Sequence, residues 1–285
     1  MTCLRWPWKS IEYFAVKITN CSEGDRKSAQ AEVNIFEHIS KSESQHIGRR
    51  YVRVMKDSFT IQGPHGQHIC LALEPMRQTL WTVPPYLGCT ILPAPVFKPL
   101  LQLLLLGLDF LHSDCHIIHT GKYLKTHIHT PFNLLNCEDL KADNFMLVFE
   151  EDGVIDDYVK NLDKDPSPCE ERDGRPIYAS RPDFGPLRRG RGRLKISDFG
   201  RAVFGNKSLL YYHKIQPVQF SAPEVLLKAG WTYSADIWNM GMVVSTLTLV
   251  AFLSTSVISC EQIAMASLGA CFTTRWNWSG SCRIL

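Results

Sequence analysis

The sequence predicts an α+β fold in two parts, a small strand-rich part followed by a mainly helical part. Residues 11–18 and 68–74 are rich in aromatic and branched residues, which is typical of strands. Residues 96–112 are apolar on nearly every side, which predicts a helix buried inside a larger domain. A proline-rich hinge separates the two parts, and its prolines are Pro84, Pro85, Pro93 and Pro95.

Length and composition set the first limits. The chain has 285 residues, 45% of them hydrophobic, which is enough for one large domain or two small ones. Its net charge of +3 is too small to indicate binding to nucleic acid or to a membrane surface. The ten cysteines contain no C-x-x-C pair, so we expect no zinc site and reduced thiols, as in a cytoplasmic or nuclear protein.

The first part contains a predicted helix and a second pair of strand signals. Residues 27–39 place apolar side chains on one side of a helix. These apolar positions are Ala29, Val33, Phe36 and Ile39. Strands are expected at 52–59 and 68–74, because the glycines and proline of 63–66 form a strong turn signal between them.

Residues 150–193 are the polar part of the chain. Their first half is acidic, and their second half ends in a basic run at 188–193. Two interpretations remain open: a solvated insert with charged ends, or a docking or nuclear-localisation patch. Residues 194–196 then read as a short strand.

One segment resembles a membrane span. Residues 242–259 are uncharged and mostly apolar, and ~18 such residues approach the length needed to cross a bilayer. Serines and threonines recur through the segment and make it rather polar. We therefore expect a buried helix that continues into irregular sequence, and no membrane span.

Charged residues at characteristic spacings indicate phosphoryl-transfer chemistry, which needs positioning and cancellation of negative charge more than covalent help. Lys17 lies on the first predicted strand, where it would hold nucleotide phosphates. Glu32 follows fifteen residues later on the predicted helix and is placed to pair with Lys17.

The remaining candidates lie in the motifs D-L-K-x-x-N (139–144) and D-F-G (198–200). Asp139 would orient the substrate hydroxyl and accept its proton, and Lys141 would contact the transferred phosphate. Asn144 and Asp198 would hold magnesium ions. Four residue types at these spacings and in this order are hard to meet by chance.

With these motifs the chain resembles the eukaryotic protein kinases, and in detail the SR-protein kinase group, particularly its fungal members. Further matches are G-P-H-G-Q-H at 63–68, G-L-D-F-L-H at 107–112, A-P-E at 222–224 and the segment 231–239. The resemblance covers roughly residues 11–120 and 139–244. It implies a two-lobed kinase-like fold with a small antiparallel-sheet N-lobe and a mainly helical C-lobe.

The resemblance also implies a domain division and a nucleotide pocket. Residues 1–83 would form a partial N-lobe with the hinge, and residues 84–244 a partial C-lobe that contains the variable insert 150–193. Leu73 would be the gatekeeper, and Glu74 to Met76 would form the hinge under the adenine. Residues 245–285 match nothing in the family and stay unassigned.

The function implied by the resemblance is that of a serine/threonine protein kinase that uses ATP and Mg²⁺. Its substrate would be a protein, in this group often an arginine/serine-rich splicing factor. We expect a monomer in the cytoplasm or nucleus, with no direct contact to nucleic acid or membrane.

The chain departs from the family pattern in several places. No glycine precedes Gly24, so we expect the glycine-rich loop over the phosphates to be missing from this sequence and both lobes to be incomplete. An 18-residue insertion at 121–138 separates His119 and Thr120 from Asp139. Three alternatives therefore stay open: an active kinase, a catalytically impaired pseudokinase or interaction module, and the product of a mis-spliced gene model.

Overall fold

The computed structural model describes residues 2–4, 12–89, 92–120, 142–151, 153–172, 174–181, 183–188, 193–206, 208–216 and 220–253. The predicted catalytic residues Asp139 and Lys141, the insertion 121–138 and the tail beyond 253 lie outside these described residues.

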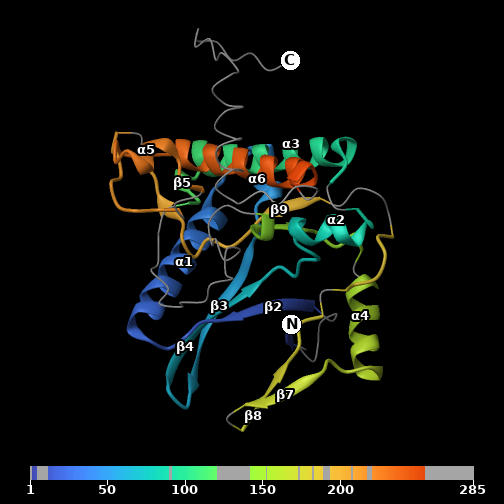
Figure 1. Ribbon diagram of the computed structural model, residues 1–285. Helices are drawn as coiled ribbons and strands as arrows, with labels where there is room; N and C mark the ends of the chain where they lie inside the picture. The colour runs from blue at the N-terminus through green and yellow to red at the C-terminus, as the bar shows by residue number, and fades with distance from the viewer. Residues whose placement is uncertain are drawn as a thin grey trace.

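The first part of the chain forms a four-stranded antiparallel sheet with the strand order β1-β2-β4-β3 (Figure 1). Its strands are β1 (Thr2–Leu4), β2 (Glu12–Ile18), β3 (Met55–Gly63) and β4 (Gly66–Leu73). Strand β4 lies at the centre and pairs with both β2 and β3. The predicted turn is confirmed, since Gly63 pairs with Gly66 at the tip of the β3–β4 hairpin.

Helix α1 (Glu23–Lys41) follows β2 and contacts β3 and β4. It begins four residues before the predicted start because Ser22 caps it, accepting a hydrogen bond from the backbone N–H of Asp25 at 3.2 Å. The acidic residues in its first turn stabilise the helix, because their negative charge lies near the positive end of the helix dipole. The predicted apolar side is confirmed, because Ala29, Val33, Phe36 and Ile39 are all buried.

The second part is dominated by two long helices, α3 (Ala94–Ser113) and α6 (Ser234–Leu253), which lie together at the top of Figure 1. Short strand pairs lie between these helices and the sheet, β5 (Ile117–Ile118) with β10 (Val203–Phe204) and β6 (Phe145–Leu147) with β9 (Leu194–Ile196). The short helices are η1 (Ile47–Tyr51), η2 (Leu80–Thr82), α2 (Val83–Tyr86), η3 (Ala142–Asn144) and α5 (Pro223–Leu226).

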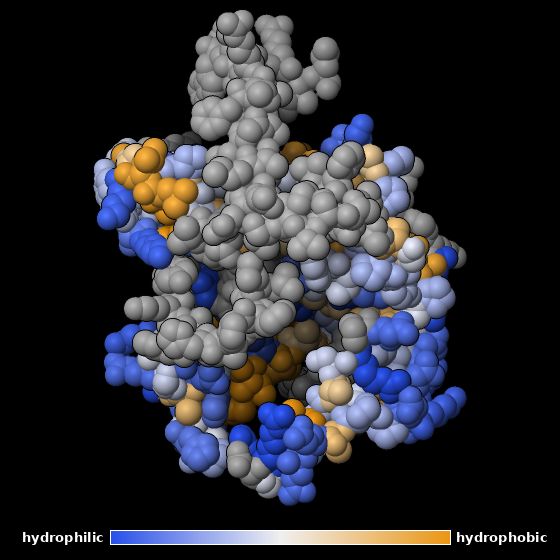
Figure 2. Space-filling model, viewed as in Figure 1, coloured by the Kyte–Doolittle hydropathy of each residue, from blue (hydrophilic) through white to orange (hydrophobic). Residues whose placement is uncertain are grey.

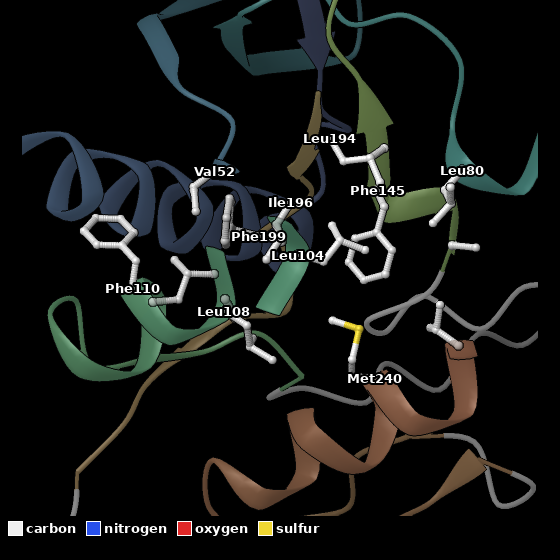
Figure 3. Close-up of a cluster of buried hydrophobic side chains, with 14 of the residues drawn as sticks. Val52, Leu80, Leu104, Leu108, Phe110, Phe145, Leu194, Ile196, Phe199 and Met240 are labelled. Atoms are coloured by element: carbon white, nitrogen blue, oxygen red, sulfur yellow. The ribbon is translucent and has the colours of Figure 1, made fainter. Parts of the chain in front are cut away.

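One hydrophobic core joins the two parts (Figure 3). Leu104 and Leu108 of α3 pack in it with Phe145 of β6 and Met240 of α6. Val52, which precedes β3, forms a parallel bridge with Ile196 of β9, so the first part is attached directly to the strand that precedes the D-F-G motif. Each fully buried side chain of this kind contributes about 1.5–3 kcal/mol relative to an exposed one.

Helix α3 confirms the predicted apolar helix, but only one side of it is buried: 33% of its apolar window is buried, and Val96 and Leu105 are exposed. Among the described residues, α3 is the one helix whose length and composition would allow it to cross a membrane. Its residues Leu104, Leu108 and Leu111 are buried in the core, and core helices of soluble proteins also pass this test. Of the predicted buried helix at 242–259, residues 242–253 belong to α6 and residues 254–259 lie outside the described part.

The polar insert contains structure that the sequence did not predict. Helix α4 (Gly153–Lys164) is followed by the hairpin β7 (Cys169–Arg172) and β8 (Arg175–Tyr178). The viewed face of the molecule is mostly hydrophilic over α4, whereas an apolar patch lies over α5 (Figure 2). The first interpretation, a solvated insert, therefore describes its outer face, while the docking interpretation stays a prediction.

The insert is also fastened to the rest of the protein. Arg77 has a fully buried side chain and binds both carboxylate oxygens of Glu150, at 2.8 and 2.7 Å. Arg77 and Tyr86 both donate hydrogen bonds to the carbonyl oxygen of Gly185. On the other side, the Tyr13 hydroxyl of β2 donates to Asp156 of α4 at 2.5 Å. The insert thus bridges the sheet and the helical part.

Candidate active site

A three-residue ion cluster lies between the sheet and the helical part. The Lys17 ammonium donates to the two carboxylate oxygens of Glu32, at 2.9 and 2.8 Å, and to Oδ1 of Asp198 at 3.2 Å. The predicted pairing of Lys17 with Glu32 is therefore present. The structure adds Asp198, which is 181 residues away from Lys17 in the chain.

Each member of the cluster is placed by a different element. Lys17 pairs with Leu71 in the β2–β4 ladder, and Glu32 lies on the sheet-facing helix α1, only 3% exposed. Asp198 follows strand β9 and has a positive φ of 61°, a conformation that aspartate tolerates better than most residues. Gly200 leaves room for the carboxylates, since a Cβ there would lie 3.3 Å from Oε2 of Glu32.

The cluster shifts the pKa values of its members. Burial alone would lower the pKa of Lys17, but the carboxylates of Glu32 and Asp198 outweigh burial and raise it. Burial alone would raise the pKa of Asp198, but the charge and hydrogen bond of Lys17 outweigh burial and lower it. Lys17 is therefore a cation and Asp198 an anion at neutral pH.

A cavity of about 300 Å³ opens beside the cluster. Lys17, Asn144 and Asp198 line it, together with Leu73 and Met146. One carboxylate and one amide oxygen suit Mg²⁺, which takes only one or two protein carboxylates and completes its coordination with phosphate and water oxygens. The donor set therefore fits a metal–phosphate group, with Lys17 available to the phosphate.

The predicted hinge residues have defined places as well. The Glu74 carboxylate accepts two hydrogen bonds from Lys195, at 2.8 and 2.6 Å. Met76 is 5% exposed and packs in the interior. Leu73, the predicted gatekeeper, lines the cavity, whereas Glu74 and Met76 are not among its lining residues.

The chain on both sides of the predicted catalytic segment is firmly held. The backbone N–H groups of His119 and Thr120 each donate to the buried carboxylate of Asp236, at 2.8 Å. The His119 ring contacts the carbonyl oxygen of Ser197 at 2.9 Å. Asn144, on the far side of residues 121–141, is 4% exposed and lines the cavity.

Sequence reasoning missed two features of this site. Phe199 of the D-F-G motif packs edge-on against Phe36 of α1, with ring centroids 5.1 Å apart, and lies 5.2 Å from the His119 ring. Arg53 reaches the cavity lining from the segment before β3. The sequence placed Phe36 on the apolar side of its helix but did not indicate its contact with Phe199, and nothing local in the sequence marks Arg53.

No protein-family model matches the chain, but individual proteins named as kinases do. A serine/threonine protein kinase of Aspergillus fumigatus is 32% identical over 234 residues, which cover 81% of this chain and 50% of that protein. A serine/threonine-protein kinase SRPK of Physarum polycephalum is 27% identical over 248 residues, covering 82% of this chain and 53% of that protein.

A solved crystal structure of a kinase domain matches the fold, with a TM-score of 0.55. It is 23% identical in sequence, and the match covers 84% of this chain and 57% of that chain. At this identity the likeness shows the fold alone. The predicted two-lobed α+β kinase fold is thereby confirmed.

The sheet, the helical part and the ion cluster between them have the architecture of a kinase domain. The sequence relatives of this chain carry the names of protein kinases, among them the serine/threonine-protein kinase SRPK of Physarum polycephalum and the protein kinase dsk1 of Schizosaccharomyces pombe, so the chain is similar to SRPK-type kinases. It spans about half the length of the relatives that it matches. The domain boundaries at 83/84 and 244/245 stay predictions.

Proposed function

We propose that this chain transfers the γ-phosphate of ATP to a serine or threonine hydroxyl of a protein. The observation that carries the proposal is the position of Lys17, which is shared between Glu32 and Asp198 at a cavity that Asn144 also lines. A cation held by two carboxylates next to potential metal ligands is an arrangement suited to phosphate groups.

We assign the roles from the motifs that these residues match, and for Lys17, Glu32, Asn144 and Asp198 their placement at the cavity supports the assignment. Lys17 binds nucleotide phosphates, and Glu32 keeps the ammonium pointing at them. Asn144 and Asp198 hold magnesium, which when bound neutralises charge on the phosphates. The predicted hinge, Glu74 to Met76, would lie next to the adenine, since it directly follows the cavity-lining Leu73. In the transfer, the substrate oxygen bonds to the γ-phosphorus, the bond to ADP breaks, and Asp139 takes the hydroxyl proton while Lys141 contacts the phosphate.

Relatives indicate the kind of substrate. The matched proteins include the SRPK of Physarum polycephalum and the SRSF protein kinase 3 of Mus musculus, the latter 27% identical over 162 residues. We propose arginine/serine-rich splicing proteins as substrates of this chain, and a monomer that acts in the cytoplasm or nucleus. No direct contact with nucleic acid or membrane is part of the proposal.

Replacing Asp139 with asparagine tests the proposal. Without a proton acceptor at this position, we expect the rate of transfer to an arginine/serine peptide to fall by about 10²–10⁴-fold, with ATP binding retained. The measurement is single-turnover transfer of the γ-phosphate in the presence of magnesium. Asp163→Asn on the insert helix α4 is the matched control and leaves the rate unchanged.

Unchanged transfer by Asp139→Asn would refute the assignment of the base. ATP binding without transfer by the unaltered chain would instead favour the pseudokinase alternative.

A further inference from the structure

Arg53 is a buried cation that the proposed reaction does not use. Its side chain comes from the segment between η1 and β3, and the residue is 8% exposed. The Nε and Nη2 groups both donate to the carbonyl oxygen of Glu74, at 2.9 and 2.7 Å. The Nη1 group donates to Oγ of Ser197 at 3.1 Å. The planar fork of the guanidinium thus joins two points that are far apart in sequence.

Those two points adjoin different residues of the cavity lining. Glu74 follows β4 directly, next to the cavity-lining Leu73, where the nucleoside would lie. Ser197 directly precedes Asp198, the carboxylate that faces Lys17. The main chain of Arg53 is fixed as well, because its N–H donates to the carbonyl oxygen of Ile196 at 2.9 Å.

The charge of Arg53 is compensated from several sides. Burial lowers the pKa of Arg53 to about 10, against the opposing effect of the carboxylates of Glu74, Asp198 and Glu32. The guanidinium is therefore protonated at neutral pH. A buried cation is costly unless it is paired and hydrogen-bonded, and Arg53 also donates from Nη1 to Sδ of Met146 at 3.8 Å, so its hydrogen bonds hold it in one place.

We propose that Arg53 is a positioning residue that sets the spacing between the nucleoside end and the metal–phosphate end of the cavity. This inference rests on the proposed nucleotide-dependent function. A ligand that spans both ends, such as ATP, depends on this spacing. A ligand that occupies only the nucleoside end, such as adenosine, does not.

The variant Arg53→Lys tests the proposal because it keeps the charge and removes the fork. A lysine ammonium is a compact point charge and cannot reproduce the planar set of donors. We expect affinity for ATP with magnesium to fall about 10–100-fold, the size of effect of losing hydrogen bonds to a charged group, and affinity for adenosine to change less than about twofold. Both are measured by calorimetric titration of the whole chain.

Two further variants complete the experiment. Arg49→Lys is the matched control, since Arg49 is exposed and donates to the carbonyl oxygen of Ser40 at 3.2 Å. It leaves both affinities unchanged. Ser197→Ala removes a single hydrogen bond of the fork and is expected to weaken ATP binding several-fold but not adenosine binding, so it tests the spacing even if Arg53→Lys fails to fold.

Three results would overturn the inference. ATP affinity of Arg53→Lys equal to that of the unaltered chain would show that charge alone matters. Equal losses for ATP and adenosine would show a general structural role. ATP binding by a folded Ser197→Ala variant at full affinity would show that the link to Ser197 has no effect. An unaltered chain that binds neither ligand is a different result, and contradicts the proposed function itself.

Discussion

Replacing Lys17 with methionine is expected to lower the rate of phosphoryl transfer by about 10²–10³-fold, the usual effect of removing one preorganised charge-stabilising donor. Methionine has a similar length and no charge, so it removes the ammonium that Glu32 and Asp198 hold at the cavity. The measurement is single-turnover transfer at saturating ATP, which separates the chemical step from weaker binding.

The direction of the pKa shift of Lys17 determines the pH at which this assay is run. The folded pKa of Lys17 is raised, so the stabilisation from its ion pairs is fully present below the unfolded pKa and is lost as pH rises through the folded pKa. Assays near neutral pH therefore compare methionine with a fully charged lysine.

Glu32→Gln is the matched control for Lys17→Met. Glutamine keeps the shape of the side chain and removes the charge that orients Lys17, so an intermediate loss of rate is expected. The double variant should be no slower than Lys17→Met alone, because Glu32 acts through Lys17. Additive losses in the double variant would show that the two side chains act independently and would contradict the arrangement.

The second large effect is expected for Asp236→Asn, which should lower the free energy of unfolding by about 3–5 kcal/mol. The Asp236 carboxylate is fully buried and accepts hydrogen bonds from the backbone of His119 and Thr120 and from Nε2 of His112, all at 2.8 Å. Asparagine has a single acceptor oxygen, so its amide nitrogen would face an N–H donor. Chemical denaturation measures the loss.

The same carboxylate predicts a pH dependence. Burial alone would raise the pKa of Asp236, but its hydrogen bonds with His112 and His119 outweigh burial and lower it. The stabilisation is thus present above the unfolded pKa and is lost as pH falls through the lowered folded pKa.

Asp109→Asn, which alters an exposed carboxylate beside His46, is the control for Asp236→Asn and should change the free energy of unfolding by less than about 1 kcal/mol. Equal stability of the two variants would contradict the role given to Asp236.

Much of the fold could be predicted because its signals are local. The apolar period of α1, the branched residues of β2 and the turn between β3 and β4 all lie within short windows of sequence. The pairing of Lys17 with Glu32 could also be predicted, because a strand and the following helix fix both residues.

The parts that could not be predicted depend on contacts between distant residues. The sequence of helix α4 is polar and predicts only a solvated segment. The insert is anchored just before this helix by the buried ion pair of Glu150 with Arg77, and the two residues are 73 positions apart, so no short window of sequence indicates the contact. Arg53 and Ser197 are 144 residues apart, and neither carries a motif that indicates their contact. The motif around Asp139 predicts chemistry, but its geometry lies outside the described residues.

The central claim is that the cavity lined by Lys17, Asn144 and Asp198 is a metal–nucleotide site. Calorimetric titration of the whole chain with ATP, with and without magnesium, tests it most directly. The account predicts that magnesium strengthens ATP binding and that Asp198→Asn, which removes a carboxylate ligand, abolishes this effect of magnesium. No ATP binding, or binding that responds to magnesium equally in the unaltered chain and in Asp198→Asn, would contradict it.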